Sequence, residues 1–335
     1  MWDCHTHFGG SELAFGIQDG TKAWLPGAGA LIGALTVDDL RRTLMAGFTS
    51  VREVGGYAGD VAPAVAMGAI VGPHIYSSIS VLSITGGHGD AHDVPLGTVR
   101  QACSHGGSYI CDGADECTRA VREVVRRGAK VIKICSTGGV LSLNDQPEDS
   151  QFSPAELRAI VAEAARTGRV VASHAIGKPG IMDALEAGVK TIEHGCYLDD
   201  EVAARMKDKG AILVPTRHII ETLAADASGL APESREKLAR MTKLSRDSLA
   251  LAVRLGVKVA LGTDTFSSKR ESRIAHGKNA AELLWAVEAG MTPLQAIEMA
   301  TANGPETLYV LLPWSLLSRN RVWWTNTHCG PGLSC

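Results

Sequence analysis

Short apolar runs rich in β-branched residues alternate along the chain with longer stretches whose apolar residues recur at helical spacing. The runs with the length of strands span residues 2–7, 47–54, 74–84, 129–135, 168–175, 190–195, 211–216 and 257–264. Strands that alternate with helices predict a parallel sheet joined by right-handed crossovers. Eight such units predict an α/β fold, the (β/α)₈ or TIM barrel, with the functional site at the carboxyl ends of the strands.

The stretches between these runs carry signals for the ends of helices. Ser153, Pro154 and Glu156 form a complete capping-box signature ahead of a helix that stops at Gly168. Thr36 is a candidate N-cap for an earlier helix. Each of these helices falls between two strand-like runs, in agreement with the β/α alternation.

The polar residues that stand out lie where the strand-like runs end. They are His5 and His7 in the first run, His88 after the third, His174 at the end of the fifth, His194 at the end of the sixth and Asp264 at the end of the eighth. Alternate residues of a strand face the same side, so His5 and His7 point the same way and can chelate a metal ion. Histidines scattered by chance have no reason to gather on one rim of a barrel, and their placement favours a metal site there.

Lys133 lies inside the fourth run, in the sequence VIKIC. Strand alternation places Val131, Lys133 and Cys135 on one face and the two isoleucines on the other, which suits packing against helices. Lys133 then points into the barrel, where an unpaired ammonium is costly. It can pair with a carboxylate or extend its charged end to the rim. Alternatively, the deprotonated amine reacts with CO₂ to give a carbamate that can bridge two metal ions, and the histidines and aspartate on the same rim favour this interpretation.

Composition narrows the classes of partner. The 335 residues carry a formal net charge of −3 with no basic stripe, which argues against nucleic acid. No apolar run approaches the length of a membrane span, and no charged-then-apolar leader is visible, although a native N-terminal extension or signal could be missing from this sequence. The eight cysteines are scattered without a CxxC pair and are expected to be reduced, as in a cytoplasmic protein.

Five motifs, in order along the chain, carry a resemblance to a known family. They are DCHTH in the first strand, VIKIC in the fourth, SHAIG in the fifth, IEHG in the sixth and LGTDT in the eighth. Together with TGGHGD, QFSPAELRAIVAEA and ATANGPETL, they make the chain resemble the amidohydrolase superfamily in its binuclear, carboxylated-lysine branch. Within that branch the chain is similar to imidazolonepropionase-like and Xaa-Pro dipeptidase-like members and to fungal ochratoxinase-type amidases. The resemblance runs from residue 2 to residue 308.

The resemblance implies hydrolysis of a C–N (amide) bond by a hydroxide that bridges two divalent metal ions, expected to be Zn²⁺. The implied ligands are His5, His7 and Asp264 for one ion, His174 and His194 for the other, and carboxylated Lys133 between the two. Asp264 would act as the catalytic base that takes the proton of the attacking hydroxide and passes it to the leaving amine. The expected substrates are small amides, namely N-acyl amino acids or dipeptides.

Four residues near the same rim are candidates for contact with the substrate. His88 would act with the catalytic groups by binding a substrate carbonyl or carboxylate, and Arg217 and His218 would hold a C-terminal carboxylate. Tyr197 would form part of the pocket wall. The deaminase branch of the superfamily fits less well, because Gly177 stands where those relatives have a helper glutamate.

Members of this family carry a smaller accessory β-sandwich domain, and most of it has no counterpart in this sequence. We expect a catalytic barrel domain over residues 1–308 and an atypical tail over residues 309–335 that is not part of the family fold, in a chain truncated at both ends. Two alternatives to amide hydrolysis stay open: hydrolysis of a cyclic amide or a lactone at the same metal centre, and an inactive truncated family member. Analogy with the branch also suggests a homo-oligomer.

Overall fold

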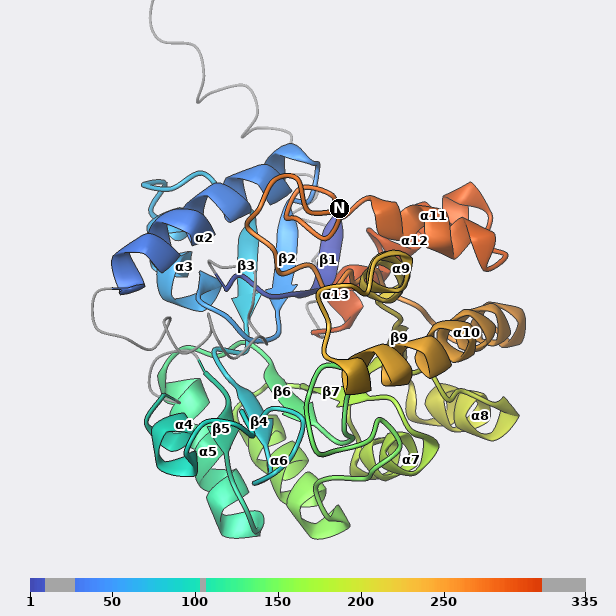
Figure 1. The fold of residues 1–335 in the computed structure, drawn as a ribbon, viewed down its shortest axis with the longest axis horizontal. Helices are drawn as coiled ribbons and strands as arrows, with labels where there is room; N and C mark the ends of the chain where they lie inside the picture. Colours follow the sequence, from blue (N-terminus) through green and yellow to red (C-terminus); the bar gives the residue numbers. More distant parts are fainter. Residues whose placement is uncertain (10–27, 103–106, 309–335) are drawn as a thin grey trace, which may run out of the picture.

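Parallel strands form the centre of the molecule, and helices surround them (Figure 1). The computed structural model describes residues 1–9, 28–102 and 107–308. The strands are β1 (Trp2–Thr6), β2 (Ser50–Glu53), β3 (His74–Ser77), β4 (Val81–Ser83), β5 (Tyr109–Ile110), β6 (Ile132–Cys135), β7 (Val171–Ala175), β8 (Thr191–His194) and β9 (Ile212–Val214). The helices are α2 (Ala28–Met45), α3 (Ala58–Ala66), α4 (Leu96–Ala102), α5 (Ala114–Arg126), α6 (Pro154–Arg166), α7 (Lys178–Ala187), α8 (Asp200–Lys209), α9 (Arg217–Ala225), α10 (Pro232–Leu255), α11 (Ala281–Glu288), α12 (Pro293–Met299) and α13 (Asn303–Glu306).

The strands pair in parallel in two sheets, ordered β1-β2-β3 and β5-β4-β6-β7-β8-β9. Residues 257–264 lie between β9 and β1 and bond to both. Leu213 of β9 forms a parallel bridge with Val259, and the Cys4 amide of β1 donates to the Leu261 carbonyl at 2.7 Å. The predicted eighth strand therefore occupies its place in the ring, but it pairs through isolated bridges and single hydrogen bonds.

The two sheets also meet on the other side of the ring. The Lys130 amide, just before β6, donates to the Ser77 carbonyl at the end of β3 at 2.8 Å, while β4 pairs directly with β6. The predicted strand over 74–84 is divided into β3 and β4 because the backbone turns at Ile79, whose φ is 70°. With these two strands at one position, the ring has eight members in parallel, and the predicted TIM barrel is confirmed. The short strand β5 was not predicted.

The two predicted helix starts have different outcomes. The Ser153 side chain accepts a hydrogen bond from the Glu156 amide, and the Glu156 carboxylate accepts one from the Ser153 amide, so the capping box at α6 is confirmed. The prediction that Thr36 is an N-cap is wrong, because α2 begins eight residues earlier at Ala28. The preceding stretch is rich in alanine and leucine, which are strong helix formers, and continues the helix toward the N-terminus.

The two faces of β6 follow strand alternation. Ile132 and Ile134 are fully buried in the main hydrophobic cluster, which includes Val121 of α5 and Leu157 of α6. Complete burial of such a side chain contributes about 1.5–3 kcal/mol. Lys133 lies on the opposite face and lines a cavity inside the ring. The isoleucines therefore anchor the strand to its helices and leave the lysine facing inward.

The described part of the barrel reaches residue 308, where Leu308 packs against clusters formed by strand residues of the ring. The predicted atypical tail, residues 309–335, lies outside the described residues. Within the described ranges, no helix combines the length and the apolarity that crossing a membrane would need.

Candidate metal centre

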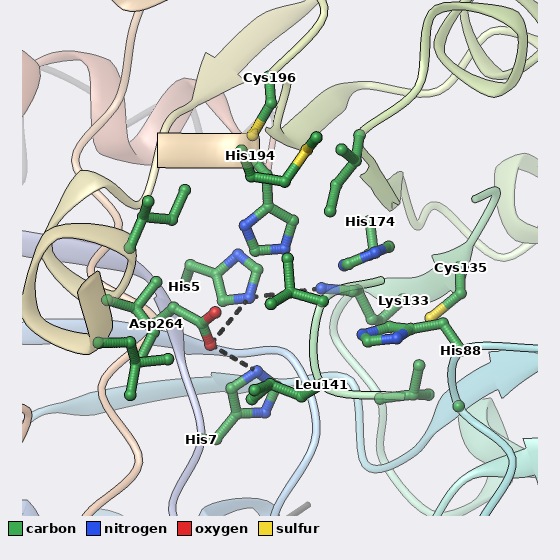
Figure 2. Close-up of a pocket in the computed structure, with 18 of the residues that line it drawn as sticks. His5, His7, His88, Lys133, Cys135, Leu141, His174, His194, Cys196 and Asp264 are labelled. Carbon is green, nitrogen blue, oxygen red and sulfur yellow. Dashed lines mark hydrogen bonds and ion pairs between the residues drawn. The ribbon is translucent and has the colours of Figure 1, made fainter. Parts of the chain in front are cut away.

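Three side chains from distant parts of the sequence meet at the carboxyl ends of the strands (Figure 2). His5 lies in β1, His7 follows this strand, and Asp264 ends the segment over residues 257–264 that bonds to it. Nε2 of His5 and Nε2 of His7 lie 3.5 and 3.2 Å from Oδ1 of Asp264. One ligating atom from each residue lies within 4.8 Å of the others. Two imidazole nitrogens and a carboxylate oxygen at this spacing suit a Zn²⁺ ion.

Hydrogen bonds to the ring nitrogens that face away from Asp264 orient the imidazoles of His5 and His7. Nδ1 of His5 lies 2.7 Å from Oε2 of Glu193, and Nδ1 of His7 lies 2.8 Å from the Gly55 carbonyl oxygen. A carboxylate and a carbonyl can only accept, so each Nδ1 carries the ring proton and each Nε2 keeps its lone pair on the side of Asp264. Partners of this kind fix the orientation of histidines that ligate metals. The residues present therefore fit a metal ion at this point.

His174 and His194 form a second group beside the first. The ring centroid of His194 lies 5.1 Å from that of His5 and 4.6 Å from that of His174. Nε2 of His174 donates to the Gly138 carbonyl at 3.0 Å, and Nδ1 of His194 lies 2.7 Å from the Thr216 hydroxyl. Burial lowers the pKa of His5 and His174 well below the usual value and that of His194 to about 4. These imidazoles are therefore neutral and offer lone pairs to a metal ion.

The backbone is left-handed at three positions where strands end, and this directs side chains toward the site. The φ angles are 71° at His194, 47° at Thr216 and 59° at Asp264. A non-glycine residue in this region costs on the order of 1–3 kcal/mol. In a regular strand Glu193 and His194 would face opposite sides. The turn at His194 allows Glu193 to contact His5, while His194 itself lines the cavity that Lys133 also lines.

Lys133 reaches the same place from β6. Its side chain is 3% exposed, and its Nζ lies 3.5 Å from Nε2 of His5 (Figure 2). Burial lowers the pKa of its ammonium group. Among the residues that the structure describes, no carboxylate forms an ion pair with Lys133, and its burial rules out a charged end at the rim. Carbamate formation requires a deprotonated primary amine, and burial shifts Lys133 toward that form beside the candidate metal ligands.

These polar residues form one wall of a cavity, and apolar side chains form the other. The cavity encloses about 820 Å³, counting the part that is open to solvent. The apolar wall includes Leu141, Ile219, Ile220, Leu223, Leu238 and Met241, which come mainly from α9 and α10. Such a cavity suits a small molecule that carries an apolar part next to a polar, reactive group.

The structure brings one of the four predicted substrate residues to the cavity. His88 lines it, and burial lowers the pKa of this imidazole to about 3. Tyr197, Arg217 and His218 are not among the described residues that line the cavity. Arg217 instead pairs with Glu221, while Tyr197 donates to a loop carboxylate and His218 bonds to a loop carbonyl.

Four residues that support the site were missed by the sequence analysis: Arg52, Ser142, Asp145 and Glu193. Arg52 and Glu193 are fully buried, and Nη2 of Arg52 donates to Oε1 of Glu193 at 2.7 Å. Both lie inside strand-like runs, where a charged residue that faces the barrel needs a partner. The argument that singled out Lys133 could therefore have found Arg52, whereas for Glu193 strand alternation conflicts with an inward-facing His194. Ser142 and Asp145 lie in a long loop without a comparable signal.

Comparison with known proteins agrees with this arrangement. The model of the amidohydrolase family matches residues 1–310. The sequence is 44% identical to ochratoxinase of Aspergillus niger over 323 residues, which cover 91% of this chain and 64% of that protein. The chain thus spans less than two thirds of the length of this curated relative.

Solved structures show the same similarity. The crystal structure of A. niger ochratoxinase has a TM-score of 0.85 and 43% identity, over 93% of this chain and 72% of that chain. A prolidase complexed with N-methylphosphonate-L-proline has a TM-score of 0.81 and 33% identity, over 92% and 73% of the two chains. A Xaa-Pro dipeptidase with methionine bound in its active site has a TM-score of 0.77 and 31% identity, over 92% and 74%. Since the family model matches residues 1–310 of the 335, the chain belongs to the amidohydrolase family.

Proposed function

We propose that this chain is a metal-dependent hydrolase that cleaves the C–N bond of a small amide, either an N-acyl amino acid or a dipeptide. The observation that carries the proposal is the meeting of His5, His7 and Asp264 around one point, with Lys133 beside them. The names of similar proteins support it, since they include an ochratoxinase, a prolidase and a Xaa-Pro dipeptidase. An apolar wall facing this polar group suits a substrate with an apolar side chain or acyl group.

The proposed site holds two divalent metal ions. Its ligands would be His5, His7 and Asp264 for one ion, His174 and His194 for the other, and a carbamate on Lys133 between them. Neutral imidazoles and carboxylate oxygens favour Zn²⁺ as the metal. When bound, two such ions lower the pKa of water and polarise the substrate carbonyl.

Asp264 is the residue that moves the proton in this proposal. Next to a bound cation its carboxyl is ionised, and it can accept the proton of the attacking water and then deliver it to the nitrogen of the leaving amine. The apolar wall limits access of further water to the reacting carbonyl.

Metal content and turnover, measured on the purified chain, test the proposal. We expect about two metal ions per chain and turnover of N-acyl amino acids or dipeptides. Removal of the metal should abolish this turnover. Lys133→Ala should abolish turnover and lower the metal content. Lys130→Ala is the matched control, because Lys130 is an exposed lysine just before the same strand and should leave both unchanged. In ¹³CO₂-enriched buffer, the wild-type chain should show a carbamate carbon signal that Lys133→Ala lacks.

Three outcomes would contradict this proposal in different ways. Full activity of Lys133→Ala would refute the role of the lysine. Turnover confined to lactones or cyclic amides would replace amide hydrolysis by the alternative reaction at the same centre. A folded chain without bound metal and without turnover of any of these substrates would show an inactive family member.

A further inference from the structure

His88 projects into the cavity from the loop after β4, outside the proposed metal ligands. Its ring stacks on that of His174, with centroids 4.0 Å apart and an interplanar angle of 19°. Figure 2 shows the ring beside Lys133. The stack leaves little room on the other side, because a Cβ atom added at Gly139 would lie 2.1 Å from the ring atom Nδ1. Packing therefore fixes the plane of the ring but not which of its nitrogens carries the proton.

A chain of hydrogen bonds decides the position of that proton. Nδ1 of His88 lies 2.8 Å from Oγ of Ser142, and this hydroxyl lies 2.6 Å from Oδ1 of Asp145. A carboxylate only accepts, so the single proton of Ser142 goes to Asp145. The Ser142 oxygen is then an acceptor for His88, and Nδ1 must be the donor. In the neutral imidazole, Nε2 is left without a proton.

The Asp145 carboxylate that ends this chain is itself held in place. Nζ of Lys237 lies 3.5 Å from Oδ1 of Asp145 and donates to the Ser142 carbonyl at 2.9 Å. Lys237 is 1% exposed, and a buried charge of this kind needs a partner of opposite charge beside it. The Gln151 amide donates to Oδ2 of Asp145 at 3.2 Å and accepts from the His88 amide at 3.0 Å. The same carboxylate thus orients both the backbone and the ring of His88.

We propose that Ser142 and Asp145 are positioning residues that keep His88 in its Nδ1–H tautomer, so that Nε2 accepts a hydrogen bond from the N–H of the substrate's scissile amide. This step rests on the proposed amide hydrolysis. It differs from a role in which His88 donates to a carbonyl or a carboxylate, because an unprotonated Nε2 has nothing to donate. It also assigns a preference for substrates whose scissile bond carries an N–H.

The tautomer can be read directly, without a substrate. Two-bond ¹H–¹⁵N correlation spectra of the full chain with ¹⁵N-labelled histidine distinguish protonated from unprotonated ring nitrogens, and His88→Gln identifies the signals of His88. We expect protonated Nδ1 and unprotonated Nε2 in the wild-type chain and in Ser142→Thr, which keeps the hydroxyl. In Ser142→Ala the Nδ1 acceptor is lost, and the Nε2–H form should appear. An unchanged tautomer in Ser142→Ala, or an Nε2–H form in the wild type, would overturn the positioning role.

Kinetics then test what Nε2 does. In Ser142→Ala, kcat/KM for an amide substrate should fall about 10-fold at unchanged metal content, the size of one lost buried hydrogen bond. The ester with the same acyl group has no N–H at the scissile bond and should lose less. Equal losses for amide and ester would refute the acceptor role. If the wild-type chain hydrolyses no amide, the proposed function fails, while the spectra still decide the tautomer on their own.

Discussion

The buried pair of Arg52 and Glu193 offers a perturbation whose effects on stability and on metal binding can be separated. Glu193 accepts from Arg52 through one oxygen, and its other oxygen bonds to His5. Arg52 also donates to the Cys4 carbonyl at 2.5 Å and to the Thr191 hydroxyl at 2.9 Å. Glu193→Gln keeps the size of the side chain but removes the charge that both neighbours face.

The expected loss of stability follows from the complete burial of both charges. Arg52 and Glu193 are both 0% exposed, and loss of one charge of a fully buried pair costs about 3–5 kcal/mol, because the other charge stays buried without compensation. The same substitution weakens the bond that orients His5. Loss of such a partner of a metal-ligating histidine lowers metal affinity roughly 10–100-fold.

Two measurements and two further variants separate the effects. Urea unfolding of the metal-free chain measures stability, and competition with a chromogenic chelator measures metal affinity. Arg52→Met combined with Glu193→Gln removes both charges and should recover part of the lost stability, but not the metal affinity. Glu163→Gln is the matched control, because its partners Arg122 and Arg166 are exposed, so loss of the carboxylate leaves no charge buried without compensation.

Two results would refute this reasoning. If Glu193→Gln is as stable as Glu163→Gln, the charge of Arg52 is compensated in some other way. If the double variant regains full metal affinity, then the carboxylate does not orient His5, and the loss in the single variant came from a disturbed fold.

Three further predictions use other parts of the molecule. Gly139→Ala should lower kcat/KM at least about 10-fold with the fold retained in circular dichroism, because its Cβ would displace the His88 ring. Burial raises the pKa of Asp39 to about 6, so the folded chain binds a proton that the unfolded chain has released. Stability should therefore fall as the pH rises from about 4 to about 6, and Asp39→Asn should flatten this fall in thermal melts. Arg217→Met should leave KM for N-acyl amino acids unchanged, because Arg217 pairs with Glu221 instead of facing the cavity. It should destabilise the chain in urea unfolding by about 1.5–3 kcal/mol, the size of one hydrogen bond between charged groups, because Glu221 keeps Arg246 as a partner.

The barrel could be predicted from the sequence because each of its elements follows from local pattern. Apolar runs alternate with amphipathic stretches eight times, and packing of one face of each strand against helices leaves few arrangements. What the pattern could not show is how the backbone departs from regular strands. Ile79 divides one strand-like run because its φ is positive. Thr36 lies inside a helix that begins earlier than the sequence predicted. Neither event changes the apolar pattern, so neither leaves a signal in it.

The candidate metal ligands could be placed on one rim from the sequence for a similar reason. A histidine or aspartate at the carboxyl end of a barrel strand has few places to go other than the central cavity. Their supporting residues were harder to find, because strand alternation assigns Glu193 and His194 to opposite faces. The left-handed backbone at His194 brings both to the site, and this conformation is stabilised by contacts between distant strands, such as the bond to Thr216.

The residues that follow a strand are the least predictable, and α9 shows why. Arg217 and His218 begin this helix, and their amides donate to the two oxygens of Glu282 at 2.9 and 2.7 Å, which fixes the direction of the first turn. Helical spacing then places Ile219, Ile220 and Leu223 on one face, toward the cavity, and Arg217 away from it. The direction in which Arg217 points is therefore decided by the apolar face of the helix and not by its closeness to the rim. A carboxylate on the substrate would meet apolar side chains along α9, so its binding group must lie on another element.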